Sequence, residues 1–374
     1  MPPVAHVEAE LGFARPDQVA PDHERTGLLR ARTQERGAPE VWDFRSCVLH
    51  DMADPAVPSP HLDEAGFEAV DISGNDALQR ALAMVASDDA ITETSDRSLR
   101  DALHGSVLRL ADGRGLRIDY VADDGLINRR GGPNRLNVNL GGADGRNGHD
   151  TAAGMHADQD VFGVPLRKLM DGKAPEVFRH RTPDGSNDES STYLLNLWIP
   201  LQQVTNPLVF MDRRTLDQQR HQLRYGLPVE GFLERDEDER VNDIWKFLPD
   251  PRQEFWFRSD MGPDRAFVFD TLGTPHGAGR LAGEEALEVL FLVLDSACIS
   301  AAAGDTEALA ELAGITAPDL PDATTDAIRA AHAHMVEVLR RASTDDDWIT
   351  EARAAMDTVI RKSVEMRIVA TVVD

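Results

Sequence analysis

A histidine and an aspartate stand two residues apart in the segment GMHADQD, at His156 and Asp158. Side chains at positions i and i+2 of a β-strand point to the same face, so an imidazole and a carboxylate with this spacing can bind one metal ion together. A facial triad of two histidines and one carboxylate needs one more histidine from another segment, and it leaves three positions open on Fe(II) for a cosubstrate and oxygen. The pair alone is weak evidence, because another pair of this form stands at His61 and Asp63 in a proline-rich stretch without a strand pattern.

Three later segments carry polar side chains at the ends of apolar runs. LLNLWIPL contains Trp198, and the following run PLVFMDRR ends with Asp212 and Arg214. Strand ends that face the mouth of a barrel often contact a ligand, so these three residues are candidates for substrate binding. Trp198 fits a core position better than a substrate platform, and Asp212 and Arg214 also fit a solvated turn.

His276 follows the apolar run DRAFVFD, at the exit of an expected strand. The segment RKSVEMR opens a last expected strand and places Arg361, Ser363 and Arg367 at alternate positions. These three side chains therefore share one face of that strand.

The elements that must position these residues are mainly short strands. Two Asp-Gly pairs within residues 106–128 indicate β-hairpins, and the spacing of Leu78, Leu82 and Val85 predicts a helix over residues 75–87. A short strand is expected within 41–49 and a short helical turn over 98–103. Further strands are expected at residues 136–140, 191–201, 208–211, 254–258 and 265–270.

From Gly283 to residue 360 the pattern becomes helical, with Thr325 and Asp345 as cap residues before two of the segments. Because a β-branched segment follows at 363–373, we expect the helices to interrupt a single sheet structure. The predicted organisation is a 1–105 N-terminal extension packing on the core, a core of 106–282 plus 361–374, and a 283–360 helical insertion that serves as a lid or an oligomerisation element.

The composition excludes several partners. The chain of 374 residues has 65 acidic and 39 basic residues, for a formal net charge of −26. Binding to nucleic acid or to an anionic membrane depends mainly on Lys and Arg, so neither is expected as a partner. The two cysteines, Cys47 and Cys298, are far apart and form no CxxC pattern, and the N-terminus shows no secretion signal. We therefore expect a cytoplasmic protein that acts on a small molecule.

Taken together, these motifs resemble the Fe(II)/2-oxoglutarate-dependent dioxygenase superfamily. Within it they look most similar to the phytanoyl-CoA-hydroxylase-like oxygenases and to the gibberellin-desaturase-like branch. The resemblance covers residues 134–281 and 361–373, which is under half of the chain. The matching residues are Asn196, Trp198, Pro200 and Leu201, then Pro207, Leu208 and Asp212, then His276, and finally Arg361, Ser363, Glu365 and Arg367.

The resemblance implies an α+β fold with a double-stranded β-helix (jelly-roll) core, N-terminal helices and a C-terminal helical insertion before the last strand. It implies that His156, Asp158 and His276 bind Fe(II). It also implies that Arg361 and Ser363 bind the distal carboxylate of 2-oxoglutarate, a task that suits the planar fork of a guanidinium. Arg367 and Arg280 are reserve candidates for that contact. Arg361 departs from most relatives, in which the arginine follows the second histidine without a long helical segment in between.

The implied reaction consumes 2-oxoglutarate and O2, releases succinate and CO2, and hydroxylates or desaturates a natural product or an amino-acid-derived compound. Since Asp158 keeps the carboxylate that related halogenases lack, halogenation is not expected. A homodimer through the helical insertion is a further expectation.

Three other functions have to be weighed at this point. Gly277, Gly279 and Ala282 form a GxGxxA pattern between a strand and a helix, which in a dinucleotide-binding fold would indicate an NAD(P)-dependent oxidoreductase. The long helical region that follows is a poor context for that motif. A metal-free jelly-roll binding protein would show a replaced ligand, and none of the three is replaced. A zinc hydrolase could use the same ligand types, but no HExxH or GxSxG motif supports it.

Overall fold

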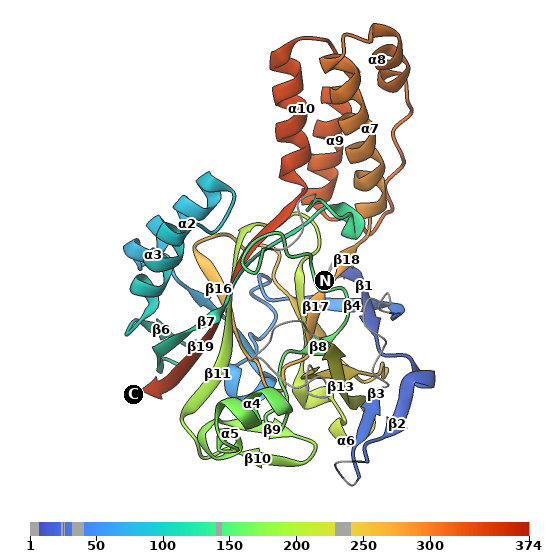
Figure 1. Ribbon diagram of the computed structural model, residues 1–374. Helices are drawn as coiled ribbons and strands as arrows, with labels where there is room; N and C mark the ends of the chain where they lie inside the picture. Colours follow the sequence, from blue (N-terminus) through green and yellow to red (C-terminus); the bar gives the residue numbers. More distant parts are fainter. Residues whose placement is uncertain are drawn as a thin grey trace.

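The main parts of the described structure are two large β-sheets and a separate group of helices (Figure 1). The structure is a computed structural model, and it describes residues 7–23, 25, 27–31, 41–139, 144–228 and 241–373. The charged run ERDEDER at 234–240, whose composition predicts a solvated face, lies outside these residues.

The smaller sheet has six strands, in the spatial order β5 (Phe67–Asp71), β16 (Arg265–Asp270), β11 (Thr192–Gln202), β19 (Arg361–Val373), β7 (Gly115–Gly131) and β6 (Val107–Arg109). The larger sheet has eleven, in the order β18 (Arg280–Leu281), β1 (Val7–Phe13), β4 (Asp43–Asp51), β15 (Phe255–Phe257), β12 (Leu208–Met211), β17 (His276–Ala278), β8 (His156–Ala157), β14 (Val241–Phe247), β13 (Gln222–Pro228), β3 (Leu29–Ala31) and β2 (Val19–Pro21). A separate hairpin joins β9 (His180–Thr182) to β10 (Gly185–Asn187).

Along the chain, the strands of the central region cross several times from one sheet to the other, although β12 to β15 all lie in the larger sheet. The pairs β7 and β8, β11 and β12, β15 and β16, and β17 and β19 each place one strand in either sheet. The pairings among these strands within each sheet are antiparallel. Together with the helices, this arrangement confirms the predicted α+β class.

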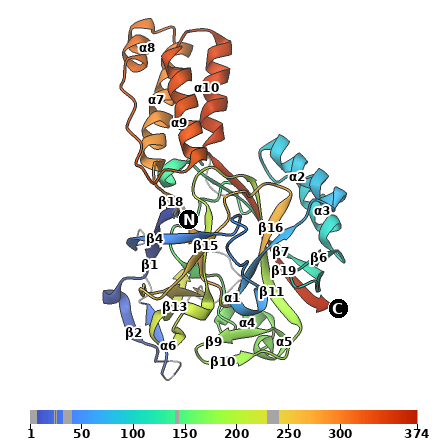
Figure 2. The same cartoon turned by 180° about the vertical axis from the view of Figure 1, so that it is seen from behind.

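Strand β11 shows how sequence alternation produces the two layers. Leu195, Leu197 and Ile199 are fully buried on one face, in a cluster that also contains apolar residues of two N-terminal helices. Those helices are α2 (Asp76–Asp88) and α3 (Glu93–Leu103), which cover the outer side of the smaller sheet (Figures 1 and 2). The alternate residues Asn196 and Trp198 point to the other face, where Trp198 packs with side chains of the larger sheet. The site must therefore be sought between the sheets.

Four long or medium helices separate β18 from β19 in the chain: α7 (Glu284–Ala302), α8 (Thr306–Ala313), α9 (Asp326–Arg340) and α10 (Asp346–Thr358). They pack on one another through buried residues such as Leu290, Leu294 and Met335, and they project from one end of the sheets (Figure 1). The shorter helices are α1 (Leu62–Ala65), α4 (Val164–Leu169), α5 (Ala174–Val177) and α6 (Gln218–His221), with single 3₁₀ turns at Pro16–Gln18, Pro133–Arg135 and Arg213–Thr215. The domain boundaries and the homodimer stay predictions.

Several predicted elements are present. Asn75 caps α2 by accepting a hydrogen bond from the Leu78 backbone N–H at 3.0 Å, and the first Asp-Gly pair, at Asp112 and Gly113, lies in the turn between β6 and β7. The turn expected at the second Asp-Gly pair is wrong, because Gly125 of that pair lies inside β7. There an added Cβ would stand 2.6 Å from the Cβ of Arg367, so the glycine allows close packing against β19.

The strand expected at 136–140 is also wrong for its described part, residues 136–139. Asn134 has a left-handed backbone with φ of 54°, which a strand does not accommodate. The amides of Asn137 and Asn139 bind the Asp150 carboxylate, so polar side chains rather than a strand ladder organise this segment. No helix in the described ranges is long and apolar enough to cross a membrane, and Cys47 and Cys298 are both free thiols.

Candidate metal centre

Strands β8 and β17 lie side by side in the larger sheet, and their register places His156 directly opposite His276. The two imidazole rings have centroids 4.4 Å apart. Asp158 follows β8, with its carboxylate oxygens 3.3 Å from His156 Nε2 and 3.8 Å from His276 Nε2. One ligand atom from each of the three residues lies within 4.8 Å of the others, which is a spacing that can hold one metal ion.

Backbone carbonyls fix the orientation of both rings. His156 Nδ1 lies 2.8 Å from the Gly154 carbonyl oxygen, and His276 Nδ1 lies 3.0 Å from that of Thr274. A carbonyl can only accept, so Nδ1 of each ring carries a proton, and Nε2 is the ring nitrogen nearest Asp158 in both histidines. In metal sites a hydrogen bond of this kind at one ring nitrogen leaves the other nitrogen to bind the metal.

The electrostatics favour the metal-binding form of Asp158 and of His276, whereas for His156 the effect of burial is outweighed by the hydrogen bond and charge of Asp158, which raise its pKa. Burial by itself would raise the pKa of Asp158, but the His156 hydrogen bond and the nearby His276 and Arg367 lower it well below its usual range. Burial, together with neighbouring His156, lowers the pKa of His276 to about 4. At neutral pH the cluster therefore offers a carboxylate and a neutral imidazole, which are the forms that bind metal.

Neighbouring strands of the smaller sheet hold the carboxylate ligand. Asn196 of β11 donates from Nδ2 both to Asp158 Oδ2 and, at 3.0 Å, to Glu365 Oε1. Thr271 donates to Asn196 Oδ1 at 3.1 Å, which fixes the orientation of the amide. Glu365 of β19 also accepts from Arg129 Nε at 2.9 Å. These contacts orient Asp158 from the side opposite the histidines.

A small cavity adjoins the two histidines. It is lined by Arg129, Ala152, His156, Trp198, Leu208, Phe269, His276, Gly277, Ala278, Arg361 and Glu365. Its free volume is about 10 Å³, which is room for roughly one water molecule. A larger ligand would need its side chains to shift.

Two of the described residues that line this cavity, Trp198 and Arg361, and the nearby Ser363 of the same strand as Arg361 have buried donors without a partner. Among the described residues, Trp198 Nε1, Arg361 Nε and Ser363 Oγ are buried polar atoms with no hydrogen-bond partner. Arg361 is 2% exposed, and its guanidinium lies 5.1 Å from the Trp198 ring. Burial and then the charge of Arg129 lower the pKa of Arg361 to about 9, so it stays a cation at neutral pH. Buried donors and an uncompensated cation suit an anionic, oxygen-rich ligand.

Of the remaining candidates, Arg367 lies closest to the metal ligands, with Nη2 3.6 Å from Asp158 Oδ2. Arg367 contacts Asp158, a candidate metal ligand, and unlike Arg361 it does not line the cavity.

Asp212 and Arg214 are not brought to the cavity. Asp212 is 1% exposed and accepts hydrogen bonds from the backbone and the side chain of Arg214, so the pair forms a turn after β12. Arg214 also pairs with Glu64 at 3.0 Å. The turn interpretation of these two residues therefore fits better than substrate binding.

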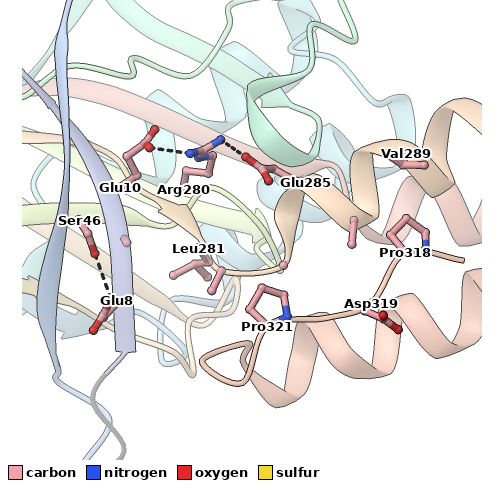
Figure 3. A pocket seen from close by; sticks show the side chains of 14 residues that line it. Glu8, Glu10, Ser46, Arg280, Leu281, Glu285, Val289, Pro318, Asp319 and Pro321 are labelled. Carbon is pink, nitrogen blue, oxygen red and sulfur yellow. Dashed lines mark hydrogen bonds and ion pairs between the residues drawn. The ribbon is translucent and has the colours of Figure 1, made fainter.

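Arg280 belongs to a different hollow. It donates to Glu10 at 2.6 Å and to Glu285 at 2.8 Å, on the wall of a groove of about 510 Å³ between β1, β18 and the start of α7 (Figure 3). Its charge is thus already paired, away from the histidines.

The dinucleotide interpretation of Gly277, Gly279 and Ala282 is wrong. Strand β17 runs antiparallel to both β12 and β8, whereas a dinucleotide-binding turn needs a parallel βαβ unit. An added Cβ at Gly277 would stand 3.0 Å from the Gly154 carbonyl oxygen, so close packing of β17 on the segment before β8 explains this glycine.

Arg129 was missed as a site residue, and Asn196 and Glu365 were recognised only as parts of motifs. Period-2 alternation offered a signal for the last two, because Asn196 shares a strand face with Trp198 and Glu365 shares one with Arg361. No sequence signal connects Arg129 to them.

Two facing sheets with a cluster of two histidines and a carboxylate between them define a β-sandwich protein with a candidate metal centre. The same fold occurs in solved structures of the iron and alpha-ketoglutarate-dependent endoperoxidase NvfI. One of them, described as having a different conformation, is 14% identical, covers 99% of both chains and has a TM-score of 0.51. Another, a variant of that enzyme with one tryptophan replaced by phenylalanine, is also 14% identical, with 98% of each chain covered and a TM-score of 0.51. No protein-family model matches the sequence, and no curated protein does. Identity this low shows a shared fold alone.

Proposed function

We propose that this protein is an Fe(II)- and 2-oxoglutarate-dependent oxygenase. The observation that carries the proposal is the convergence of His156, Asp158 and His276 beside a cavity that contains the unpaired cation Arg361. The likeness to NvfI, an enzyme whose name states a dependence on iron and alpha-ketoglutarate, supports it through the fold.

The donor set fits the group. Two imidazoles and one carboxylate form the facial triad typical of non-haem Fe(II), and they leave coordination positions for other ligands. Buried Arg361 and the Ser363 hydroxyl fit the distal carboxylate of 2-oxoglutarate, because a guanidinium and a hydroxyl can donate to it together. When bound, Fe(II) with 2-oxoglutarate and O2 supplies the oxidation, which converts 2-oxoglutarate to succinate and CO2 and hydroxylates or desaturates the substrate.

The residues of this chain have three tasks in that reaction. His156, Asp158 and His276 hold the metal, and Asn196 fixes the carboxylate of Asp158. Arg361 and Ser363 orient the cosubstrate. The two sheets exclude water from the cavity, which strengthens the electrostatic contacts inside it.

The finer assignments are part of this proposal. The alternation of strands between sheets supports a double-stranded β-helix, or jelly-roll, core in which the helices α7 to α10 are an insertion before β19. We place the protein with the phytanoyl-CoA-hydroxylase-like or gibberellin-desaturase-like oxygenases, on the motifs named above. We propose a small natural product or an amino-acid-derived compound as the substrate, in the cytoplasm.

The test is an anaerobic titration of metal-free protein with Fe(II) and then 2-oxoglutarate. The expected result is a visible metal-to-ligand charge-transfer band, since chelation of Fe(II) by the keto acid produces one. His156→Ala and His276→Ala should each abolish the band. His334→Ala is the matched control, because this exposed histidine of α9 lies outside the cluster and its loss should leave the band unchanged. A folded parent protein that gives no band would overturn the proposal.

A further inference from the structure

Both ends of the helical segment α7 to α10 contact the same turn, formed by Thr205 and Asn206 between β11 and β12. At the start of α7, Glu284 Oε1 accepts a hydrogen bond from the Asn206 backbone N–H at 2.8 Å. Just after α10, the carbonyl oxygen of Val359 accepts from Thr205 Oγ1 at 2.8 Å. Thr205, Asn206, Glu284 and Val359 are all fully buried, so water does not compete for these hydrogen bonds.

The same turn holds Arg361. The carbonyl oxygen of Asn206 accepts from Arg361 Nη1 at 2.8 Å. Among the described residues, no carboxylate lies within ion-pair distance of that guanidinium, so Asn206 is its main polar anchor. Asn206 itself is firmly placed, because its Nδ2 donates to the Gly132 carbonyl at 2.7 Å and its backbone has a left-handed φ of 47°.

Glu284 joins three chain segments at this point. Its carboxylate also accepts from the backbone N–H groups of Leu281 at 3.0 Å and Asn134 at 2.9 Å. Burial raises the pKa of Glu284 to about 7, despite these hydrogen bonds from Asn206, Leu281 and Asn134. Burying a carboxylate costs free energy, which favours a functional role for Glu284 at this position.

We propose that Glu284 is a positioning residue for the cosubstrate: it fixes the Asn206 turn, and the turn fixes Arg361 in the cavity. The helical segment, through Glu284, then helps to position Arg361 in the 2-oxoglutarate pocket. This inference rests on the proposed function.

The test compares Glu284→Gln with Glu285→Gln. The new side-chain amide keeps the size of the carboxylate but has one acceptor oxygen in place of two, so it cannot accept from the backbone N–H groups of Asn206, Leu281 and Asn134 together, and the junction that holds the Asn206 turn should loosen. We expect the affinity for 2-oxoglutarate, measured by the charge-transfer band, to fall about tenfold, which corresponds to about 1.4 kcal/mol. Glu285 is the next residue of α7, and its side chain, which is 73% exposed, pairs with Arg280 (Figure 3). Glu285→Gln should bind 2-oxoglutarate like the parent protein.

A second ligand separates positioning from general damage. 2-Oxopentanoate has the same chelating end as 2-oxoglutarate but lacks the distal carboxylate that Arg361 would bind. Glu284→Gln should therefore leave its affinity, and that of Fe(II) alone, unchanged. An equal loss of affinity for both keto acids would overturn the inference, as would an unchanged affinity for 2-oxoglutarate.

If Glu284→Gln does not fold, Thr205→Val serves instead. It removes the hydrogen bond to Val359 with little change in shape, and we expect a smaller loss of 2-oxoglutarate affinity in the same direction, again with 2-oxopentanoate unaffected. No loss in this variant would count against the inference. Absence of the band in the parent protein would instead refute the proposed function itself, so the two failures are distinguishable.

Discussion

Two buried groups of charged side chains lie close to β8, and the arginines in them have different partners. In the first, Arg224 of β13 lies within 3.5 Å of three carboxylates, at 3.4 Å from Asp22, 3.5 Å from Asp160 and 3.0 Å from Asp243. Arg25 adds a second cation beside Asp160. We call these five residues the β13 ion cluster.

The cavity beside the histidines shows the opposite arrangement. Arg361 is as buried as Arg224, but its polar anchor is a backbone carbonyl and its nearest ring is that of Trp198. Glu365, the acid on the same strand, is paired with Arg129 instead. A buried arginine surrounded by carboxylates stabilises the chain that contains it, whereas a buried arginine without one has capacity left for an anionic ligand.

Arg224→Met would break the first arrangement and should have the largest effect on stability. The substitution keeps an unbranched side chain but leaves three buried carboxylates without their shared cation. We expect the free energy of unfolding to fall by about 3 to 5 kcal/mol, measured by urea denaturation. Any folded fraction should still give the charge-transfer band. A loss below about 1 kcal/mol would show that the β13 ion cluster is not structural.

Arg361→Met applies the same substitution to the second arrangement. Because no carboxylate is left unpaired, we expect the free energy of unfolding to change by no more than about 1 kcal/mol, the value of one net hydrogen bond. The affinity for 2-oxoglutarate should fall about 100-fold, or about 2.7 kcal/mol, in the anaerobic titration. A stable variant with unchanged affinity would move the distal carboxylate contact to another residue, with Arg367 the next to test. Strong destabilisation would contradict the contrast between the two groups.

Some residues of the site could be predicted from local spacing in the sequence, and others could not. Period-2 spacing pairs His156 with Asp158, although β8 ends at Ala157, and the same rule places Arg361 and Ser363 on one face of β19. His276 came only from a resemblance, because its place opposite His156 depends on the register of β8 and β17. That register is set by the whole sheet, not by residues near either histidine.

The contacts around the ligands were harder to foresee for a related reason. Arg129 meets Glu365 across 236 positions of sequence, and such pairs arise from the topology. Local rules likewise predicted α2 and the first hairpin, but failed for 136–139 and for Gly125. In those two places asparagine side chains and close strand packing, both tertiary effects, override the local preference.

Asn196→Ala tests the cavity side of the comparison between the two buried groups, and among the three substitutions it should have the smallest effect. Asn196 is the only residue of the described site that donates to both Asp158 and Glu365, and Thr271 fixes its orientation. Without this amide, Asp158 keeps its charge but loses the hydrogen bond that fixes its Oδ2 atom. We expect the affinity for Fe(II) to fall about tenfold, measured by anaerobic metal titration, as is typical when a partner of a ligand is removed.

The matched control is Asn187→Ala, since this asparagine of β10 binds backbone carbonyls of residues 175 and 176 and does not line the cavity. Its iron affinity should equal that of the parent. The two site variants should then affect different ligands. Asn196→Ala should weaken the binding of Fe(II) before 2-oxoglutarate is added. Arg361→Met should leave the binding of Fe(II) unchanged and weaken only the binding of 2-oxoglutarate. If Asn196→Ala bound Fe(II) normally, the Asp158 carboxylate would be oriented by the histidines and Arg367 alone, and the smaller sheet would serve the cosubstrate but not the metal.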